Sequence, residues 1–388
     1  LAAISRRYRE RENHISSDSW PIYISLQKDG ILFKMRRTQD LPDKESATMF
    51  FQDCKLAHQA QITGISHSVK EILPPDLLDL TQLQKEANIR YGFTASEVYD
   101  IAQSLYEKKL ISYPRTSSRY LTEDVLDSLS PIMARLLSWE LFPAAKGTGG
   151  IDISSLSRHV INAEKANVHH AIIITGIRPG NMSEKEMQVY RLVAGRMLET
   201  FMAPCRIETT NVEAVCAAQH FKAEQTRIIE AGWHDVFMRS DMVPKSGYSV
   251  NELPEVEKSD TLNVCGCNMV HKKQLPVNPF TDAELVEYME QNGLGTVSSR
   301  TNIIRTLVNR KYIRYSGKYI VPTPKGMFTY ETIRGKKIAD TSLTADWEKQ
   351  LAGLESGMIT GQDFLNRIRT LTKEMTDDIF NTYSTKEE

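Results

Sequence analysis

The order of strand-like and helix-like segments limits the folds open to this chain more strongly than any single motif does. Apolar and polar residues alternate in stretches between Trp20 and His67, and helical periodicity runs from Leu83 to about Phe201. Alternation returns between Ile207 and about Val277, and the pattern from Pro279 onward is helical again. A β-rich region that is interrupted by a helical insertion and then resumed predicts that two distant segments share one domain.

The length of the chain predicts several domains, because 388 residues exceed what one hydrophobic core usually serves. The opening residues LAAISRRYRERENHI have the pattern of an amphipathic helix entered midway, which suggests a fragment. The glycines of 146–150 predict a loop inside the helical region. We predict a mixed α/β multidomain fold with a tail of an N-terminal domain at 1–12, a split β-rich domain at 13–78 and 205–275, a helical domain at 79–204 and a C-terminal helical domain at 276–388.

Charge and hydropathy narrow the classes of function. The formal net charge is −1, so any contact with nucleic acid must be local rather than spread over a uniformly basic surface. No run approaches the ~20 apolar residues that span a bilayer, and no signal-peptide segment opens the chain. The five cysteines lack CxxC spacing, which predicts reduced thiols in a cytoplasm. Zinc is not expected at Cys265 and Cys267, because only His271 lies nearby as a further ligand.

The segment 105–121, LYEKKLISYPRTSSRYL, carries the strongest candidate for chemistry. Tyr113 stands two residues before Arg115, where a helix is expected to end and a strand to begin. A tyrosine hydroxyl beside a guanidinium can attack a phosphodiester, since the planar guanidinium offers several donors to phosphate oxygens. When this tripeptide is taken alone, a half-buried strand tyrosine is the alternative interpretation.

Companion segments favour the chemical interpretation. Four segments resemble segments of type IA DNA topoisomerases, particularly of the topoisomerase III branch, and they follow in the same order as in that family. Residues 83–106 resemble the segment that leads to the active site, and residues 105–121 resemble the active site itself. Residues 168–175 resemble the histidine segment, and residues 285–313 resemble the later glycine-rich helical segment. The resemblance implies that Tyr113 becomes joined to a DNA 5′-phosphate while Arg115 and His169 stabilise the pentavalent phosphate. It also implies a monomeric, ATP-independent isomerase that cleaves and rejoins single-stranded DNA in a bacterial cytoplasm.

The same resemblance places part of the catalytic machinery outside this sequence. In type IA enzymes an N-terminal toprim domain binds Mg²⁺ through acidic residues that include an Asp-x-Asp motif, and this chain contains no Asp-x-Asp. Its start at Leu1 resembles the family segment that follows toprim. We therefore expect no metal site in this chain, Mg²⁺ in the intact enzyme, the toprim domain as a partner in cis, and no cleavage by this chain alone. The implied fold is the type IA arch, with a β-rich hinge domain and winged-helix-like helical domains.

A weak internal repeat suggests winged-helix units. Residues 307–315 align without gaps to 105–113, and Ser316-Gly317 predicts a hairpin turn after the second copy. Helix, turn, helix and wing then follow in order, which suggests one winged helix there and a second around the first copy. Chance similarity of two amphipathic helix ends is an open alternative.

Basic residues without any acidic ones between Thr296 and Tyr330 suggest a DNA-binding surface, although a charge run is often only a solvated face. Arg305 is expected to project away from the apolar stripe of its helix. Hydroxyls near the start of that helix can cap it and leave backbone donors for a phosphate. The predicted DNA-binding residues are Gln103, Ser299, Arg300, Arg305, Arg310 and Lys311.

Two other classes of protein fit part of this pattern. A non-catalytic DNA-binding module built on two winged helices would use the basic run without chemistry at Tyr113. A tyrosine recombinase also uses Tyr, Arg and His on phosphate, but it places its tyrosine near the C-terminus, after the other residues. Here Tyr113 comes first. Formation of a covalent DNA adduct, and its polarity, separates the three classes.

Overall fold

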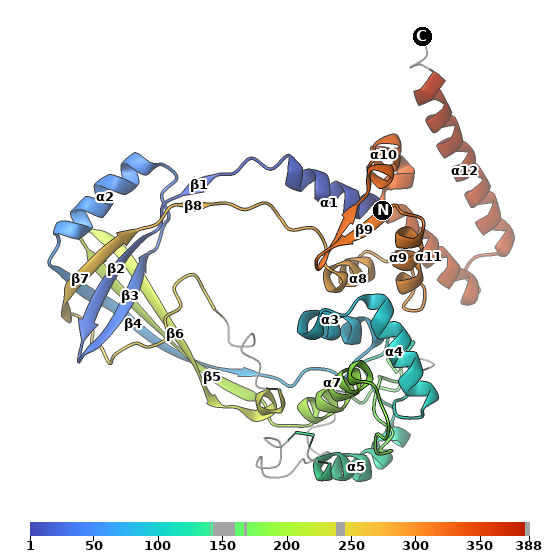
Figure 1. Ribbon diagram of the computed structural model, residues 1–388, viewed down its shortest axis with the longest axis horizontal. Coiled ribbons are helices and arrows are strands. Elements are labelled where there is room, and N and C mark those ends of the chain that lie inside the picture. The colour runs from blue at the N-terminus through green and yellow to red at the C-terminus, as the bar shows by residue number, and fades with distance from the viewer. Residues whose placement is uncertain (140, 143–159, 167–168, 238–244, 385–388) are drawn as a thin grey trace.

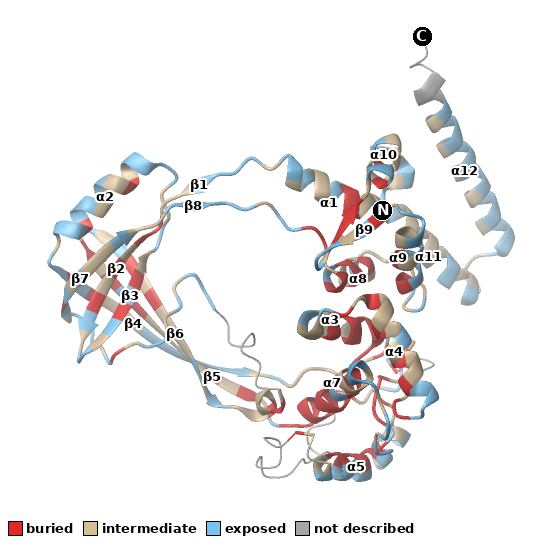
Figure 2. Ribbon diagram, in the orientation of Figure 1, coloured by how far each residue is buried: buried red, intermediate tan, exposed pale blue. Residues whose placement is uncertain are grey.

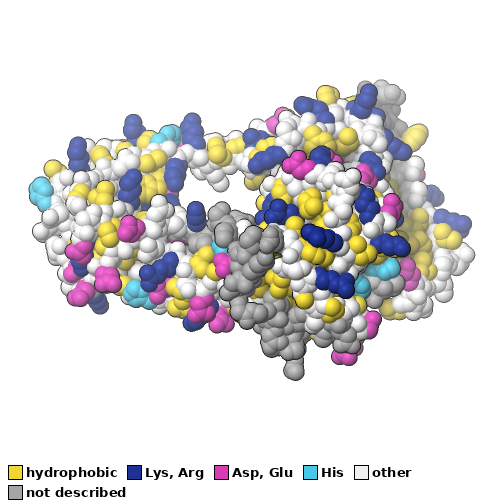
Figure 3. All heavy atoms as spheres, turned by 60° about the horizontal axis from the view of Figure 1, so that its bottom comes forward, with side chains coloured by type: hydrophobic (Ala, Val, Ile, Leu, Met, Phe, Trp, Pro, Cys, Tyr) yellow, Lys and Arg dark blue, Asp and Glu magenta, His cyan; other side chains and the backbone are white. Residues whose placement is uncertain are grey.

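The computed structural model describes residues 1–139, 141–142, 160–166, 169–237 and 245–384. A closed barrel lies at one end of the molecule and helical units lie at the other, in the predicted mixture of α and β structure (Figure 1). Figure 3 shows an opening through the molecule between these parts. The loop predicted at 146–150 lies outside the described residues.

The barrel takes strands from both sides of the helical insertion. Its strand order is β2-β3-β6-β5-β4-β7, with neighbouring strands antiparallel. Ile22, Ile24 and Leu26 point inward at every second position and are fully buried, so the period-2 pattern fills the barrel (Figure 2). The strands are β2 (Ile22–Lys28), β3 (Ile31–Arg37), β4 (Gln59–Ile72), β5 (Cys205–Cys216), β6 (Gln219–Glu230) and β7 (Thr261–Met269).

A helix covers the barrel in a stretch where the sequence predicted only strands. α2 (Lys44–Leu56) packs against β2 and β7. The Asp43 side chain caps it by accepting a hydrogen bond from the Ser46 backbone N–H at 2.7 Å. Ala47 and Cys54 are buried, about two helical turns apart. The cap and this spacing favour a helix, so the strand assignment is wrong for this part of 20–67.

Two antiparallel ribbons connect the barrel to the helical part. β4 and β5 pair from Gln61 opposite Val215 to Ile72 opposite Cys205, and this ribbon reaches the helices (Figure 1). β1 (Asp18–Ser19) pairs with β8 (Lys272–Lys273) in the second connection.

The tyrosine unit is the helical body that carries Tyr113. Its helices share one hydrophobic core and are α3 (Leu80–Tyr91), α4 (Ala95–Glu107), α5 (Glu123–Ser138), α7 (Glu184–Thr200) and the 3₁₀ helix η3 (Gly232–Val236). Capping boxes begin two of them, Thr94 with Glu97 on α4 and Ser183 with Glu186 on α7. Gly92 ends α3 with a left-handed φ of 71°. Local sequence signals therefore set the limits of these helices.

The C-terminal unit packs against the tyrosine unit through α3 and α8. The helix at the chain start, α1 (Ala2–Glu12), belongs to this unit because Ile4 lies in the same core as Phe280 and Ile320. The remaining elements are α8 (Asp282–Gln291), α9 (Arg300–Asn309), β9 (Ile313–Ser316), β10 (Tyr319–Pro322), α10 (Pro324–Ile333), η4 (Lys337–Ala339), α11 (Thr341–Glu355) and α12 (Gly361–Ser384). The predicted boundaries between domains stay a prediction. Within the described ranges, no helix is long and apolar enough to cross a membrane.

The repeated nonapeptides have matching backbone geometry. Lys109 and Lys311, at equivalent positions of the two copies, both have φ of 59°. Thr175 and Thr323 donate side-chain hydrogen bonds of 2.6 Å to the carbonyl oxygens of these lysines. The second copy continues into the expected hairpin, β9 to β10. The first copy does not form the expected strand: Ile111 makes only an isolated bridge with Ile174, and the segment then continues irregularly through Pro114, which lacks a backbone N–H.

Candidate active site

Three predicted catalytic side chains, Tyr113, Arg115 and His169, lie on neighbouring irregular segments of the tyrosine unit. The ring centroids of Tyr113 and His169 are 4.5 Å apart. Tyr106, from the last turns of α4, approaches the Tyr113 ring edge-on at 5.4 Å. Tyr113 is half-buried and His169 is exposed, so the phenol rests on protein while the site stays open to a large ligand.

Hydrogen bonds between two distant segments bring Tyr113 and His169 together. The Thr116 hydroxyl donates to the carbonyl oxygen of His169 at 2.9 Å. The Ser112 hydroxyl donates to the Ala171 carbonyl at 3.1 Å and accepts from the Ile173 N–H at 2.9 Å. The hydroxyl residues on either side of the Tyr-Pro-Arg tripeptide therefore hold the histidine segment in place. Sequence reasoning did not single out Ser112 or Thr116.

The Arg115 guanidinium is held by side chains of α4. Its Nη2 donates to Oε1 of Gln103 at 3.3 Å, and its Cζ lies 5.1 Å from the centroid of the Tyr99 ring. Its buried Nε has no hydrogen-bond partner among the described residues. Gln103 donates in turn to Glu107 at 2.8 Å. Gln103 therefore supports Arg115 here, and its predicted contact with DNA stays a prediction.

One face of α4 supports the site, and its spacing was a signal that the sequence offered. Tyr99, Gln103 and Tyr106 are separated by four and three positions, so they lie on one side of a helix.

At the end of this helix, the Lys108 ammonium, the Ser183 N–H and the Ser104 hydroxyl lower the pKa of Glu186 to about 2. Glu186 is therefore ionised at neutral pH and holds α4 against α7, and it is unsuited to donate a proton in catalysis.

The chemistry available at this site is attack on a phosphodiester. A phosphate that contacts Tyr113 would lie beside the imidazole of His169, and the guanidinium of Arg115 stands two residues along the same segment. The Mg²⁺ that the resemblance implies does not fit the donor set, because the described residues contain no group of three or more His, Cys, Asp or Glu side chains that could hold a metal ion.

The residues of the predicted DNA-binding run differ in their surroundings. Arg300 is only 8% exposed, and its Nη1 donates to the Thr81 hydroxyl at 3.1 Å and lies 3.5 Å from Oε1 of Glu290. Arg305 lies outside the hydrophobic core of its own unit, as expected, but it does not reach freely into solvent. It folds onto α4, with Nη2 2.8 Å from Oδ2 of Asp100. Both arginines face α3 or α4 because α9 packs against the tyrosine unit, so their predicted contacts with DNA stay predictions.

A polyanion has more room at three other predicted residues than at Arg300 and Arg305. These are Ser299, Arg310 and Lys311. The Ser299 hydroxyl accepts from the Thr296 N–H at 2.8 Å and makes no capping bond to α9. Arg310 and Lys311 are exposed at the turn that follows α9. Figure 3 shows Lys and Arg side chains over the helical end of the molecule as well as over the barrel. Arg310 and Lys311 are the best placed of the predicted residues to reach phosphates.

We expect the double substitution Arg310→Ala with Lys311→Ala to weaken binding of single-stranded DNA about tenfold to a hundredfold at low salt. Each phosphate contact that is lost also makes the slope of log affinity against log salt shallower by about 0.7. Fluorescence anisotropy with a labelled oligonucleotide, measured over a salt series, gives both quantities. Arg369→Ala with Lys373→Ala, two exposed cations on α12, is the charge-matched control. Equal affinity of the two double variants would mean that Arg310 and Lys311 only face solvent.

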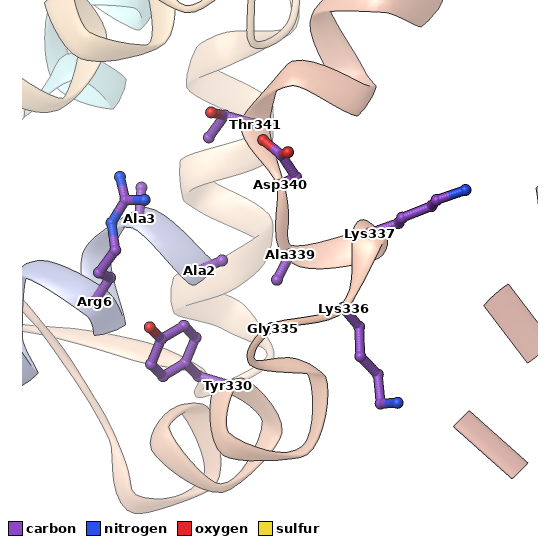
Figure 4. Close-up of a pocket in the computed structure, with 10 residues that line it drawn as sticks. All are labelled: Ala2, Ala3, Arg6, Tyr330, Gly335, Lys336, Lys337, Ala339, Asp340 and Thr341. Atoms are coloured by element: carbon purple, nitrogen blue, oxygen red, sulfur yellow. The ribbon is translucent and has the colours of Figure 1, made fainter. Parts of the chain in front are cut away.

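A pocket with a cavity volume of about 440 Å³ lies between α1, α10 and η4, among other residues than the tyrosine site (Figure 4). Its cations already have protein partners. Arg6 donates to the Tyr288 hydroxyl at 3.2 Å, Lys336 lies 3.1 Å from Oδ2 of Asp378, and Lys337 lies 3.1 Å from Oε2 of Glu374. In Figure 4 the two lysine side chains point away from the labelled tyrosine. This pocket is therefore not the candidate active site.

Comparison with known proteins gives consistent results. A family model described as "DNA topoisomerase" matches residues 1–366. DNA topoisomerase 3 of Bacillus licheniformis is 31% identical over 344 residues, which cover 82% of this chain and 47% of that protein. DNA topoisomerase 3 of Bacillus subtilis is 30% identical over 355 residues, with 84% of this chain and 48% of that protein covered. This chain thus spans about half the length of the curated relatives that it matches.

A solved structure shares the fold. Full-length topoisomerase I from Thermotoga maritima superimposes with a TM-score of 0.74 at 21% sequence identity, covering 96% of this chain and 61% of that one. At this identity the likeness concerns the arrangement of the elements. The arrangement of barrel, ribbons and helical units is therefore one that a known topoisomerase also adopts.

Proposed function

This chain belongs to the DNA topoisomerase family, in the type IA class beside the topoisomerase 3 proteins, and on that premise we propose that it carries the strand-cleaving tyrosine of such an enzyme. The observation that carries the proposal is the contact between Tyr113 and His169, with Arg115 on the same short segment. The substrate is single-stranded DNA, because an accessible backbone phosphate must reach a half-buried phenol. The enzyme acts as a monomer in the bacterial cytoplasm.

The reaction is a transesterification at phosphorus. The Tyr113 oxygen attacks a backbone phosphate and forms a phosphotyrosine bond, while the bond from phosphorus to the 3′-oxygen of the preceding nucleotide breaks. The phenol proton is given up and the departing 3′-oxygen takes up a proton, so the exchange balances. Arg115 and His169 donate hydrogen bonds to the non-bridging oxygens as charge develops on them. The new ester keeps the energy of the broken one, and the 3′-hydroxyl can reseal the strand without ATP.

The architecture supports a gate through which a second strand passes. The broken 5′ end stays on the tyrosine unit, and the 3′ end stays with the rest of the enzyme. The barrel and its two ribbons act as a β-rich hinge, and the opening visible in Figure 3 receives the passing strand. α8, α9 and the β9–β10 hairpin form a winged helix that binds DNA through Arg310 and Lys311.

Metal and general acid come from elsewhere in the intact enzyme. The described residues hold no ligand cluster for a metal ion, and the sequence has no Asp-x-Asp. We assign Mg²⁺ binding and protonation of the leaving oxygen to a toprim domain in cis. Without that help this chain binds single-stranded DNA but neither cleaves nor relaxes it, since general acid–base catalysis alone is worth about 10²–10⁴ in rate.

The polarity of the covalent adduct tests the proposal. The enzyme that contains this chain and its toprim domain is incubated with Mg²⁺ and an oligonucleotide labelled at either end, then denatured. A 5′-phosphotyrosine leaves the 3′ label on the protein and releases the 5′ label, whereas a recombinase-type adduct retains the 5′ label. Binding without an adduct would favour a non-catalytic DNA-binding module. Strong cleavage by this chain alone would contradict the assignment of metal and acid to toprim.

A further inference from the structure

Helix α4 links the tyrosine site to the C-terminal unit. Tyr99 and Gln103 on this helix contact Arg115, and Tyr106 contacts the ring of Tyr113. A shift of α4 therefore displaces the supports of Tyr113 and Arg115, two of the three groups that would act on the phosphate.

The N-terminal end of α4 is held from outside the tyrosine unit. Ala95, the first residue of the helix, is 1% exposed and lies in the core of the C-terminal unit beside Phe280 and Val286. Its backbone N–H belongs to the first turn, whose amides have no acceptor within the helix. That N–H donates to Oδ1 of Asp282, on α8, at 3.1 Å. One carboxylate of the C-terminal unit therefore caps the helix that supports the site.

Asp282 is enclosed at this contact. It is 2% exposed, and burial raises the pKa of its carboxyl group. The Tyr315 hydroxyl donates to the same Oδ1 at 3.1 Å. Tyr315 occupies, in the second copy of the repeat, the position that Tyr113 has in the first. Tyr315 contributes to the contact between the units, whereas Tyr113 is the candidate nucleophile.

A second contact, from Arg305 of α9, holds the N-terminal half of α4. Nη2 of Arg305, on α9, lies 2.8 Å from Oδ2 of Asp100, and its Nε donates to the Ser96 hydroxyl at 2.8 Å. The Asp100 side chain is 60% exposed, and an exposed ion pair contributes little by itself. The buried cap at Asp282 is therefore the stronger of the two contacts.

We propose that Asp282 is a positioning residue that couples docking of the C-terminal unit to completion of the phosphate site around Tyr113 and Arg115. While the units are docked, Asp282 caps α4 and Arg305 pairs with Asp100. Separation of the units removes the acceptor of the Ala95 amide and exposes the first turn of α4, which loosens the supports of Arg115. Cleavage and resealing then take place only in the docked arrangement. This inference rests on the proposed function.

Amide exchange on this chain tests the structural half of the inference. Hydrogen–deuterium exchange followed by mass spectrometry is measured for peptides that cover 95–103. Asp282→Ala should accelerate exchange there at least tenfold, and Asp100→Ala should do so to a smaller extent. Asp282→Asn keeps an acceptor oxygen for both donors and should stay within twofold of the unmodified chain. Asp346→Ala removes an exposed carboxylate on α11 and is the matched control. Unchanged exchange in Asp282→Ala would overturn the cap.

Cleavage by the full enzyme tests the functional half. Asp282→Ala should slow formation of the covalent adduct at least tenfold while its affinity for single-stranded DNA stays within twofold, and Asp282→Asn should restore the rate to within threefold. A general loss of stability would lower affinity and rate together. A wild-type cleavage rate in Asp282→Ala with accelerated exchange would overturn the coupling. Absence of any adduct in the unmodified enzyme would overturn the proposed function, while exchange would still decide whether Asp282 holds α4.

Discussion

Tyr113→Phe in the enzyme that includes the toprim domain is expected to abolish the covalent DNA adduct and all strand cleavage. Phenylalanine keeps the ring that packs against His169 and Tyr106, with centroid distances of 4.5 and 5.4 Å, and removes only the attacking oxygen. Affinity for single-stranded DNA should stay within about twofold, because the basic residues are unchanged. The measurement is a cleavage assay with an end-labelled oligonucleotide and Mg²⁺, stopped with denaturant so that covalently bound DNA stays with the protein.

The matched control is Tyr106→Phe, since Tyr106 is the other tyrosine in ring contact with Tyr113. It is 39% exposed, so its hydroxyl is the nearest competitor for the role of nucleophile. This variant should keep forming the adduct, and peptide mapping of the trapped product should locate the nucleotide on Tyr113. An adduct in Tyr113→Phe, or its loss in Tyr106→Phe alone, would move the nucleophile to another residue.

Arg115→Ala is expected to slow single-turnover cleavage by about 10²–10³, the usual cost of removing one donor to a developing oxyanion. The guanidinium is already oriented by Gln103 and Tyr99. A phosphate would therefore gain a preorganised donor. Resealing should slow by a similar factor, because both directions pass through the same pentavalent phosphate.

Two comparisons make the Arg115 result interpretable. Arg135→Ala removes an exposed arginine of α5 and should leave cleavage unchanged. Arg115→Lys keeps the positive charge but loses the planar fork, so it should recover only part of the rate. A cleavage rate for Arg115→Ala within threefold of the unmodified enzyme would show that the guanidinium does not contact the reacting phosphate.

Much of the fold could be predicted because its signals are local or periodic. The alternation in Ile22–Leu26 places a strand with one face in the barrel, and the Thr94 and Glu97 capping box begins α4. The α2 helix was missed because strand-like patterns surround it, and its cap at Asp43 depends on a few residues only. The strand expected at Tyr113 is reduced to a bridge at Ile111, because the Ser112 and Thr116 hydroxyls on either side of Pro114 donate to backbone carbonyls of the histidine segment.

Some features of the candidate site could likewise be predicted from the sequence, and others could not. By itself the sequence determined the spacing of Tyr113 and Arg115, the candidate histidine and the family to which the chain belongs, because these depend on residue identity and on spacing along the chain. Only the tertiary structure decided that the His169 ring lies tilted beside that of Tyr113, that Arg300 is buried against Thr81, and that Asp282 caps α4. Those contacts join segments far apart in sequence, and their geometry follows from how whole elements pack around shared cores, which no local propensity or charge pattern encodes.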